Sequence, residues 1–308
     1  MAGLGGLYFQ RVCSWQRILL ASADDGTLTL VTERASFEER WPRPAVMGVV
    51  NVTPDSFSDG GLFVAPSDAI ERGLRLLEEG AVLVDVGGES TRPGAASVST
   101  DEELRRVVPV LEGLAEKPVS IDTSKAVVAR RALQLGVELV NDVTALRGDR
   151  EMAAVVAEGN AYVCRMHMQG EPRTMQASPH YDDVVDEVLR FLEERIAFAV
   201  ECGIREERIC VDPGIGFGKT PDQNLELIRR LGEIVDLGRP VVVGISRKST
   251  LGKVLGDPAA TTGSVAASVA AAVAAFERGA WMVRAHDVRE TVEALAVAAA
   301  VERGSVPA

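Results

Sequence analysis

The sequence predicts an α/β fold, a (β/α)8 TIM barrel with an N-terminal β-hairpin extension. From residue 46 onward, short apolar segments alternate with longer segments of helical periodicity, as strand–helix units do in a parallel sheet. The short segments are apolar at almost every position, which is typical of strands buried on both faces. Eight such segments follow one another without interruption, and eight βα units are the number that closes a barrel.

The apolar segments set the expected boundaries of the elements. We expect strands over residues 46–51, 82–87, 118–122, 137–142, 161–167, 208–212, 240–245 and 280–285. Helices are expected between them, for example over residues 68–79, 101–114 and 181–199. In the last of these, Val184, Val188 and Leu192 recur at four-residue steps, which places them on one helix face. No break divides the series, so residues 46–308 are predicted to form one domain.

Residues 1–45 differ from the rest of the chain and form an N-terminal extension. Two β-prone segments flank the turn sequence DDG at residues 24–26, which is the pattern of a β-hairpin. A hairpin at this position could plug the bottom of the barrel. Residues 32–44 are expected to form a loop, because Pro42 and Pro44 discourage regular structure.

Charge and cysteine content limit the class of protein. The chain has 308 residues, and 33 Lys and Arg against 45 Asp and Glu give a net charge of −12. This charge argues against non-specific nucleic-acid binding, which needs a basic surface. The four cysteines form no C-x-x-C pair and no zinc-ligand spacing, which is typical of thiols in a reducing compartment. Polar residues interrupt residues 1–23, so we expect no signal peptide or membrane span, and a cytoplasmic enzyme.

Polar residues stand at the end of nearly every predicted strand. In chain order they are Asn51, Asp85, Asp122, Asn141, His167, Asp212, Ser246, Arg247, Lys248, Arg284 and His286. The carboxyl ends of barrel strands meet at the face where such enzymes bind ligands. We therefore expect one shared pocket. The Arg247 side chain is expected to point outside it, because strand side chains alternate in direction.

Asp122, Asn141 and Asp212 form the sharpest group within this set. Each closes an apolar run, and a buried carboxylate must be paired or hydrogen-bonded, because isolated burial of a charge is costly. Two carboxylates and an amide suit a flat heterocycle rich in N–H groups. Helix capping is the alternative, since Asp122 precedes a predicted helix. Three such residues at equivalent strand ends favour a shared ligand.

The last two predicted strands end in cationic residues. Lys248 follows the seventh strand, while Arg284 and His286 end the eighth. The loops after strands 7 and 8 of barrels often bind phosphate, and the two-residue spacing of Arg284 and His286 directs both inward. We predict an anion site there. His167 is equally compatible with a structural role and a ligand contact, and neither a zinc site nor a Ser-His-Asp triad can be defined.

Two polar loops follow the first and second predicted strands. The first, NVTPDSFSDGG at residues 51–61, combines an amide, hydroxyls and two carboxylates with Phe57. A capped turn is the alternative, but such a turn needs neither a phenylalanine nor two acids. In the second, ESTRPG at residues 89–94, Pro93 fixes the backbone beside Arg92. We interpret the first loop as a mobile lid. Arg92 is equally compatible with a positioned cation and with a solvated surface charge.

The segment GIGFGKT, residues 214–220, resembles a phosphate-binding P-loop but departs from its pattern. A P-loop requires a glycine five positions before the Gly-Lys pair. That position is Pro213, which has no N–H to donate to a phosphate. The glycines are therefore interpreted as letting the backbone and Phe217 approach a planar ligand.

Taken together, these segments resemble the dihydropteroate synthases, a pterin-binding family. Residues 47–61, MGVVNVTPDSFSDGG, and residues 85–95, DVGGESTRPGA, are similar to the two signature segments of that family. The shorter segments SIDT (120–123), ND (141–142), MHMQG (166–170), DPGIGF (212–217), SRKS (246–249) and RAHD (284–287) follow in the family's order. The resemblance covers roughly residues 45–303.

The resemblance implies a transferase of folate biosynthesis. Such enzymes join 6-hydroxymethyl-7,8-dihydropterin diphosphate to p-aminobenzoate, release diphosphate, and are the target of sulfonamides. The implied mechanism is dissociative: the C–O bond breaks first, and the amine then traps the pterin-methyl cation. The resemblance also implies Mg2+ as cofactor, small-molecule substrates and a homodimer, for which the apolar residues 266–275 could serve as core or as dimer face.

The resemblance further implies a role for each matching residue. The pterin site comprises Asp122, Asn141, Val143, Met166, Asp212, Phe217 and Lys248. The diphosphate site comprises Asn51, Thr91, Arg284 and His286, with Mg2+ beside Asn51. The p-aminobenzoate site comprises Phe57, Pro93 and Ser249, and the catalytic set is Asp59, Arg92, Lys248, Arg284 and His286.

Two departures and two alternatives accompany the resemblance. Residues 1–45 are longer than is usual in the family and have no assigned role. Thr250 stands where a bulky residue is common, at what we expect to be the p-aminobenzoate rim. A methyltetrahydrofolate methyltransferase would share the acidic pterin floor but has no need for a diphosphate clamp. The other alternative is a catalytically silent relative that binds pterin.

Overall fold

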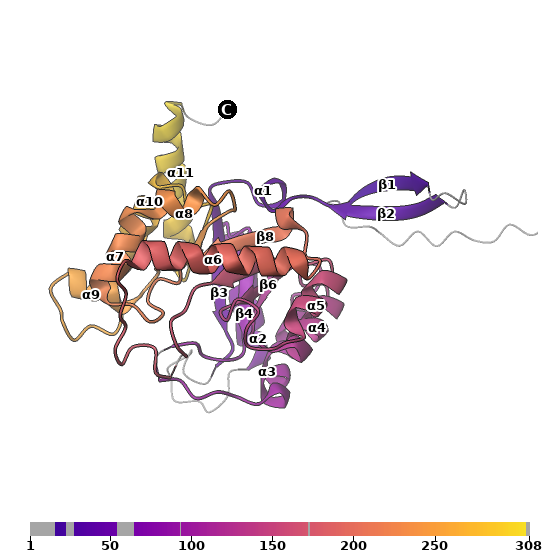
Figure 1. The fold of residues 1–308 in the computed structure, drawn as a ribbon, viewed down its shortest axis with the longest axis horizontal. Helices are drawn as coiled ribbons and strands as arrows, with labels where there is room; N and C mark the ends of the chain where they lie inside the picture. The colour runs from indigo at the N-terminus through magenta and orange to yellow at the C-terminus, as the bar shows by residue number, and fades with distance from the viewer. Residues whose placement is uncertain (1–15, 23–27, 54–64, 93, 172, 306–308) are drawn as a thin grey trace, which may run out of the picture.

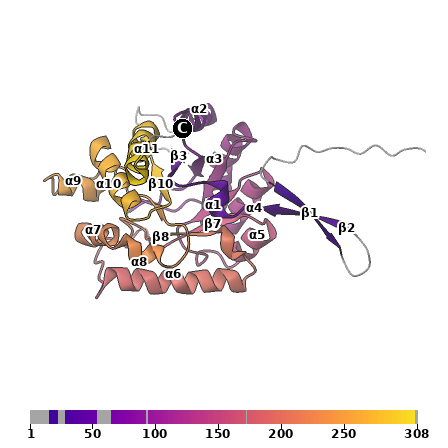
Figure 2. The ribbon, with the colours of Figure 1, turned by 90° about the horizontal axis from the view of Figure 1, so that it is seen from above.

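The computed structural model describes residues 16–22, 28–53, 65–92, 94–171 and 173–305. Its centre is a barrel of eight parallel strands (Figures 1 and 2). These are β3 (Ala45–Asn51), β4 (Leu83–Gly87), β5 (Val119–Asp122), β6 (Leu139–Asp142), β7 (Tyr162–Met166), β8 (Ile209–Asp212), β9 (Val242–Val243) and β10 (Met282–Ala285). The hydrogen-bonded order is β8-β7-β6-β5-β4-β3-β10-β9, and a bridge from Val211 of β8 to Val241, next to β9, joins the two ends. The predicted (β/α)8 barrel is confirmed.

Helices follow the strands and cover the outside of the barrel (Figure 2). They are α2 (Pro66–Glu78), α3 (Thr100–Gly113), α4 (Ala126–Gln134), α5 (Met152–Glu158), α6 (Val184–Glu201), the 3-10 helix η2 (Glu206–Arg208), α7 (Pro221–Arg229), α8 (Leu231–Val235), α9 (Ser249–Val254), α10 (Val265–Glu277) and α11 (Val288–Arg303). Local sequence sets where they begin. Asp183 caps α6, and Thr220 with Gln223 forms a capping box at the start of α7.

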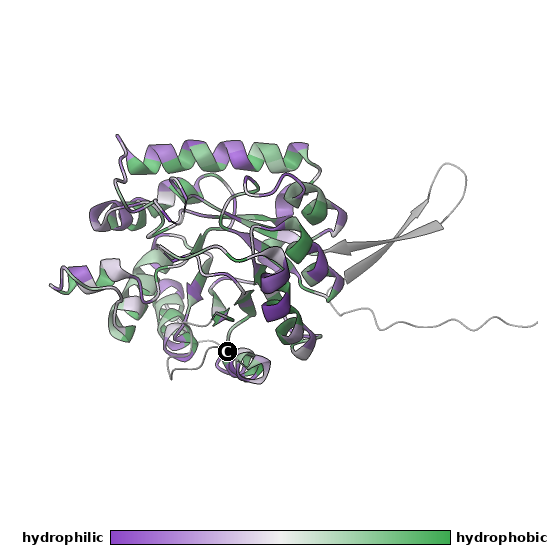
Figure 3. Ribbon diagram, turned by 90° about the horizontal axis from the view of Figure 1, so that it is seen from below, coloured by the Kyte–Doolittle hydropathy of each residue, from purple (hydrophilic) through white to green (hydrophobic). Residues whose placement is uncertain are grey.

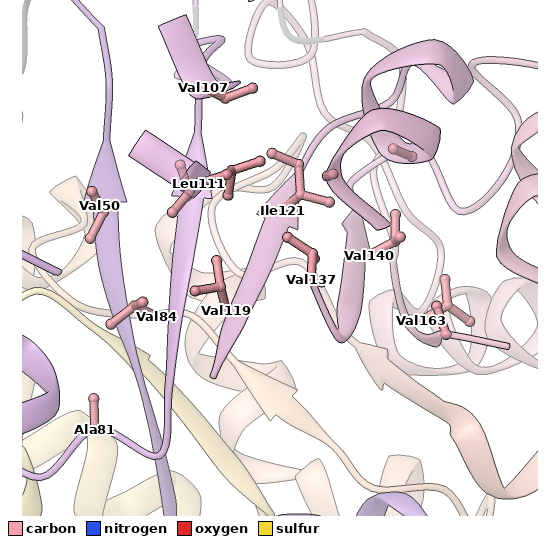
Figure 4. Close-up of a cluster of buried hydrophobic side chains, with 14 of the residues drawn as sticks. Val50, Ala81, Val84, Val107, Leu111, Val119, Ile121, Val137, Val140 and Val163 are labelled. Carbon is pink, nitrogen blue, oxygen red and sulfur yellow. The ribbon is translucent and has the colours of Figure 1, made fainter. Parts of the chain in front are cut away.

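Side-chain alternation along each strand decides which residues face the helices. Figure 4 shows Val84 and Ile121 in one buried apolar cluster with Val107 of α3. This cluster fills the space between the barrel wall and the helices. Because neighbouring residues of a strand point to opposite faces, Ser120 and Asp122 face the barrel interior. The alternation of side chains along each strand therefore explains both the apolar cluster outside the barrel wall and the polar residues inside it.

The bottom of the barrel, at the amino ends of the strands, is closed by the short helix α1 (Phe37–Arg40). Phe37 and Trp41 are at most 1% exposed. Their ring centroids lie 6.1 and 4.7 Å from that of Tyr162 on β7. All three belong to a buried apolar cluster with inward-facing residues of the strands. This cluster forms a hydrophobic floor to the barrel.

The N-terminal hairpin does not plug the barrel. Strands β1 (Gln16–Ser22) and β2 (Leu28–Arg34) pair antiparallel, and Figures 1 and 2 show them projecting away from the barrel. The expected position of the hairpin is taken by α1. The prediction of a loop over residues 32–44 is also wrong, because β2 continues to Arg34 and Ser36 begins α1 with a capping box.

Several apolar side chains remain on the surface. Val254 and Leu255 near the end of α9 are 57% and 65% exposed, and Val297 and Val301 on α11 are 65% and 76% exposed. Figure 3 shows that the helices carry both hydrophilic and hydrophobic residues, as expected of helices with one side packed on a barrel. Within the described ranges, no helix combines the length and the apolar character that crossing a membrane requires.

Candidate active site

Polar residues from four strands meet around Asp85 inside the upper part of the barrel. The Asp85 carboxylate is fully buried and accepts hydrogen bonds from Ser120 Oγ at 2.6 Å, Asn141 Nδ2 at 3.0 Å and Arg284 Nε at 2.7 Å. Arg284 also donates from Nη2 to Asp122 Oδ2 at 3.1 Å. Three residues predicted for the site, Asp122, Asn141 and Arg284, are thus joined in one network.

Asp85 was predicted only as one of the strand-end residues of the pocket, with no role of its own, although it holds this network together. The signal in the sequence is a carboxylate within the apolar segment LVDVG, residues 83–87, where only a paired charge is tolerated. Its hydrogen bonds have a consequence for its neighbour. Because the Asn141 amide nitrogen is engaged by Asp85, the oxygen of that amide is the atom that Asn141 can offer a ligand.

The position of Asp122 inside the barrel strongly raises the pKa of its carboxyl group. Burial is the main cause that raises the pKa of Asp122 to about 8; the charge of Asp85 adds to this effect and Arg284 opposes it. Asp122 does not cap the helix that follows it. The N–H of Ala126, at the start of α4, donates instead to Asp149 Oδ2 at 2.9 Å. The capping alternative is therefore wrong for Asp122.

Lys248 and Asp212 lie on the opposite side of the barrel mouth, beside Phe217. The Lys248 ammonium donates to the carbonyl oxygen of Ile215 and lies 4.6 Å from the centroid of the Phe217 ring. Burial lowers the pKa of Lys248 to about 8, with Asp212 acting against this shift. Burial also raises the pKa of Asp212, and its Oδ1 accepts the Gly214 N–H at 2.6 Å.

An apolar cluster stands next to these polar groups. Val143, Met166 and Phe217, which are predicted to line the pterin pocket, pack together with Met168 and Met175. Phe217 is partly exposed and the other four are buried. Hydrogen-bond acceptors beside apolar side chains are what a planar heterocycle needs, since its edge is polar and its faces are not.

His286 and Arg284 lie together at the end of β10. The backbone N–H of His286 donates to Ser246 Oγ at 3.1 Å, and the ring Nδ1 lies 3.1 Å from the same hydroxyl. Burial, assisted by the charge of Arg284, lowers the pKa of His286 to about 3. The ring is therefore neutral at physiological pH, and one of its nitrogens carries a proton that it can donate.

A cavity of about 620 Å³ lies beside the network, and Thr91, Asp122 and Val143 are among the residues that line it. Its volume suits a small organic ligand. Asn51, at the end of β3, lies near Asp122 across a glycine. Its Oδ1 is 3.8 Å, and the Asp122 Cβ is 3.4 Å, from the point that a Cβ on Gly87 would occupy. The absence of a side chain at Gly87 thus keeps these two residues adjacent.

The remaining predicted residues come from loops and from the start of α9. Phe57, Asp59 and Pro93 lie outside the described residues. Arg92 is exposed, and Ser249 is the half-buried first residue of α9. Arg247 points away from the pocket, as predicted, and pairs with Asp287.

His167 and Lys219 hold the glycine-rich loop between β8 and α7. Lys219 Nζ lies 2.9 Å from His167 Nδ1 and donates to the carbonyl oxygens of Gly214 and Phe217, both at 3.0 Å. The His167 ring packs edge-on against Phe191, with centroids 4.9 Å apart. Lys219 therefore binds its own loop and does not resemble a P-loop lysine, and His167 has the structural role of its two alternatives.

Thr250 does not lie on a ligand-facing rim. Its side chain is buried, and Thr250 Oγ1 accepts a hydrogen bond from Asn224 Nδ2 on α7 at 2.9 Å. Its effect on the p-aminobenzoate site therefore stays a prediction to be tested. It follows the N-terminal residue of α9, and a helix turns successive side chains by about 100°. The side chain of Thr250 thus faces α7 rather than the barrel mouth.

Comparison with known proteins agrees with this geometry. Residues 47–286 match the family described as pterin binding enzyme. The dihydropteroate synthase of Escherichia coli (strain K12) is 47% identical over 259 residues, which cover 82% of this chain and 90% of that protein. This chain belongs to the dihydropteroate synthase family. The methyltransferase alternative is thereby removed.

Solved dihydropteroate synthases share the fold. The Yersinia pestis dihydropteroate synthase in a sulfonamide drug complex has a TM-score of 0.80 and 45% identity, covering 85% of this chain and 95% of that one. The Xanthomonas albilineans dihydropteroate synthase in complex with 7,8-dihydropteroate has a TM-score of 0.75 and 46% identity, covering 86% and 95%. The match covers the barrel almost completely, so the network around Asp85 belongs to the part of the chain shared with dihydropteroate synthases.

Proposed function

We propose that this chain condenses 6-hydroxymethyl-7,8-dihydropterin diphosphate with p-aminobenzoate to give 7,8-dihydropteroate and diphosphate. One observation carries the proposal beyond family membership. Arg284 joins the acidic floor, through Asp85 and Asp122, to the end of β10 where His286 lies. The proposed substrate contains a heterocycle and an anionic diphosphate. These two groups would bind on either side of Arg284.

The pterin ring is assigned to the acidic floor. Asp122, Asn141 and Asp212 would accept hydrogen bonds from its N–H groups, and Lys248 would donate to its ring acceptors. Phe217, with the apolar cluster beside it, would cover a face of the ring. This arrangement leaves the methylene carbon of the substrate directed toward Arg284.

The diphosphate is assigned to Arg284, His286, Asn51 and Thr91. We propose that the C–O bond breaks first, so that diphosphate leaves with the bonding electrons and a pterin-methyl cation remains. The p-aminobenzoate nitrogen then bonds to that carbon and loses a proton. Arg284 and the neutral His286 would donate hydrogen bonds to the departing oxygens, where charge develops. Such pre-oriented donors lower the barrier because they need not reorganise.

The p-aminobenzoate site is assigned to Ser249 and to the two polar loops. Phe57 and Pro93 would form its walls, and Asp59 and Arg92 would complete the closed site. Closure of these loops over the substrates would exclude water, which would otherwise trap the cation. Sulfonamides, which resemble p-aminobenzoate, are proposed to compete for this site. The Yersinia pestis dihydropteroate synthase, which was solved in complex with a sulfonamide drug, supports sulfonamide binding by this chain.

Mg2+ is proposed as the cofactor on the diphosphate side. The described residues contain no group of three or more His, Cys, Asp or Glu that could hold an ion. Mg2+ still fits, because it commonly uses one or two protein oxygens and takes its other ligands from substrate phosphates and water. Asn51 Oδ1, close to Asp122, is the oxygen that we assign to it. The bound ion would stabilise negative charge on the diphosphate.

We further propose a cytoplasmic homodimer. Cys164 and Cys210 are buried partners on neighbouring strands and are free thiols, as expected in a reducing compartment. The exposed Val297 and Val301 on α11, with α10 packed against it, offer an apolar face for a second copy. Sedimentation of the full chain and of Val301→Glu tests this assignment. A monomer at micromolar concentration would contradict it.

Incubation with radiolabelled p-aminobenzoate and dihydropterin diphosphate tests the reaction. We expect label to appear in 7,8-dihydropteroate together with an equal amount of diphosphate, and neither product when one substrate is omitted. Calorimetry with the dihydropterin diphosphate alone separates binding from catalysis. Binding without incorporation of label would identify the chain as a silent pterin-binding relative and overturn the proposed activity.

A further inference from the structure

Two segments of the proposed pterin site are tied together by a side chain that belongs to neither. Asn224 lies on α7 and is 1% exposed. Its Oδ1 accepts the backbone N–H of Gly216 at 2.7 Å, and its Nδ2 donates to Thr250 Oγ1 at 2.9 Å. One amide therefore links the loop before Phe217 to the helix that begins after Lys248.

A second contact closes this link into a ring. The Lys248 ammonium donates to the carbonyl oxygen of Ile215, whose peptide bond also supplies the N–H of Gly216. The ring therefore runs from Gly216 through Asn224 to Thr250, along the backbone to Lys248, and back through Ile215. Lys248 binds the carbonyl oxygen of this peptide bond and Asn224 binds its N–H, so the peptide cannot rotate without breaking a hydrogen bond.

Gly216 brings this peptide bond close to the Lys248 side chain. Its φ is +81°, and a Cβ at this position would lie 3.0 Å from Lys248 Cδ. The backbone of the loop thus packs directly against the lysine stem with no side chain between them. A shift of the Gly216–Ile215 peptide would move both the Phe217 ring and the Lys248 ammonium, which lie 4.6 Å apart.

We propose that Asn224 and Thr250 are positioning residues that fix the separation between the Phe217 ring and Lys248, and with it the width of the slot for the pterin ring. The inference rests on the proposed function, because it concerns how that substrate is held. We assign neither residue a contact with the substrate, because Asn224 is 1% and Thr250 is 2% exposed. The Thr250 hydroxyl is the group that keeps the Asn224 amide oriented toward Gly216.

Removing this hydroxyl gives a specific expectation. In Thr250→Val the Asn224 Nδ2 loses its acceptor in a buried environment, and an amide so placed turns to find another partner. Turning releases the Gly216 N–H. We expect the KM for dihydropterin diphosphate, and its dissociation constant, to rise about 5- to 10-fold. The kcat should change less than the KM, because Arg284 and His286, which are assigned to the departing diphosphate, are not connected to this ring.

The experiment compares Thr250→Val with Thr250→Ser and with Tyr162→Phe. Thr250→Ser retains the hydroxyl and should restore the KM. Tyr162→Phe removes a hydroxyl hydrogen bond, to the Ala35 carbonyl oxygen, from an equally buried side chain at the bottom of the barrel. It should lower the Tm without changing the KM. If Thr250→Val does not fold, Thr250→Ala removes the same hydroxyl without adding bulk.

The outcomes separate this inference from the proposed function. An active wild type with an unchanged KM in Thr250→Val would overturn the inference alone. The same conclusion would follow if Thr250→Ser were impaired as much as Thr250→Val, or if Tyr162→Phe raised the KM equally. A wild type that forms no dihydropteroate would overturn the proposed function, and this inference with it. A raised KM in Thr250→Val alone supports the inference.

Discussion

The two ends of the barrel are built from the same strands but differ in chemistry. On three strands an apolar residue and a polar residue two positions later face the same interior. The pairs are Leu83 and Asp85 on β4, Leu139 and Asn141 on β6, and Met282 and Arg284 on β10. A single period-two step along the strand thus changes the interior from a hydrophobic cluster to a charged network.

The residues that stabilise the fold thus lie at the bottom of the barrel, and the residues assigned to the substrate lie at the top. At the bottom, Phe37, Trp41 and Tyr162 bury aromatic surface, which stabilises the fold without costly desolvation of charges. At the top, Asp85 and Arg284 are charges whose burial is offset by their ion pair and by further hydrogen bonds to Ser120, Asn141 and Asp122. Substitutions at the bottom should therefore change stability, and substitutions at the top should change substrate binding and rate.

Trp41→Ala is expected to have the largest effect and to act on stability alone. Removing this indole from the floor, where its ring lies 4.8 Å from Phe37 and 4.7 Å from Tyr162, should lower the free energy of unfolding by about 3–5 kcal/mol. Denaturant unfolding measures this loss. Below the onset of unfolding, kcat/KM should remain within about twofold of the wild type. A raised KM in the folded variant would show that the two ends are coupled.

Arg284→Ala is the corresponding test at the top. It removes a charge-assisted contact of roughly 1.5–3 kcal/mol to the diphosphate, so kcat/KM should fall about 10- to 100-fold. It also leaves Asp85 and Asp122 without their cation. Arg284→Lys is the matched control: it keeps the charge and most of the Tm but loses the two-pronged geometry, and should stay impaired. An unchanged rate in Arg284→Ala would remove this residue from the diphosphate site.

The spacing of apolar residues and the polar residues at strand ends made most of this structure predictable from the sequence. The apolar segments predict all eight barrel strands, because strands buried on both faces are apolar at most positions. The acceptors Asp122 and Asn141 are likewise predictable, since polar residues at equivalent strand ends converge. Both inferences depend on local pattern alone. They hold because each element packs in the orientation that its own sequence specifies.

Features that depend on packing between distant segments were not predictable in the same way. The S-x-x-E pattern at Ser36 and Glu39 is the only local signal for the short helix that follows, and this helix is stabilised by burial of Phe37 against Tyr162. The direction of the Thr250 side chain depends on its partner Asn224, which is 26 positions away. The apolar segment around Asp85 indicates a paired charge, but its partners are three donors that other strands bring to it.

Asp122→Asn tests the floor itself, with a smaller expected effect. The amide has the size of the carboxyl group, so the fold and Tm should change little. A neutral oxygen accepts the pterin N–H groups less strongly than a carboxylate, so at pH 9 the dissociation constant should rise about 10-fold, or about 1.4 kcal/mol. Calorimetry with dihydropterin diphosphate measures this change. Unaltered affinity would mean that the pterin floor is misassigned.

The difference in affinity between Asp122→Asn and the wild type should depend on pH, and this dependence gives the most sensitive test of the network around Asp85. The pKa of Asp122 is raised to about 8, so the wild type without ligand is mainly protonated at pH 6.5 and mainly ionised at pH 9. A protonated carboxyl group has little advantage over an amide. The ratio of the dissociation constants of Asp122→Asn and the wild type should therefore fall from about 10 at pH 9 to less than about 3 at pH 6.5.

Comparing the two proteins cancels the other groups that titrate nearby. Lys248, whose pKa is lowered to about 8, and the charges of Asp85 and Arg284 are present in both. Binding to the wild type near pH 7 should also release protons, because the ligand's N–H groups favour the ionised carboxylate. Calorimetry in buffers of different ionisation enthalpy measures that release. A ratio that does not change with pH would show that the charge on Asp122 has no part in recognising the pterin. The top of the barrel would then differ from the bottom in polarity alone.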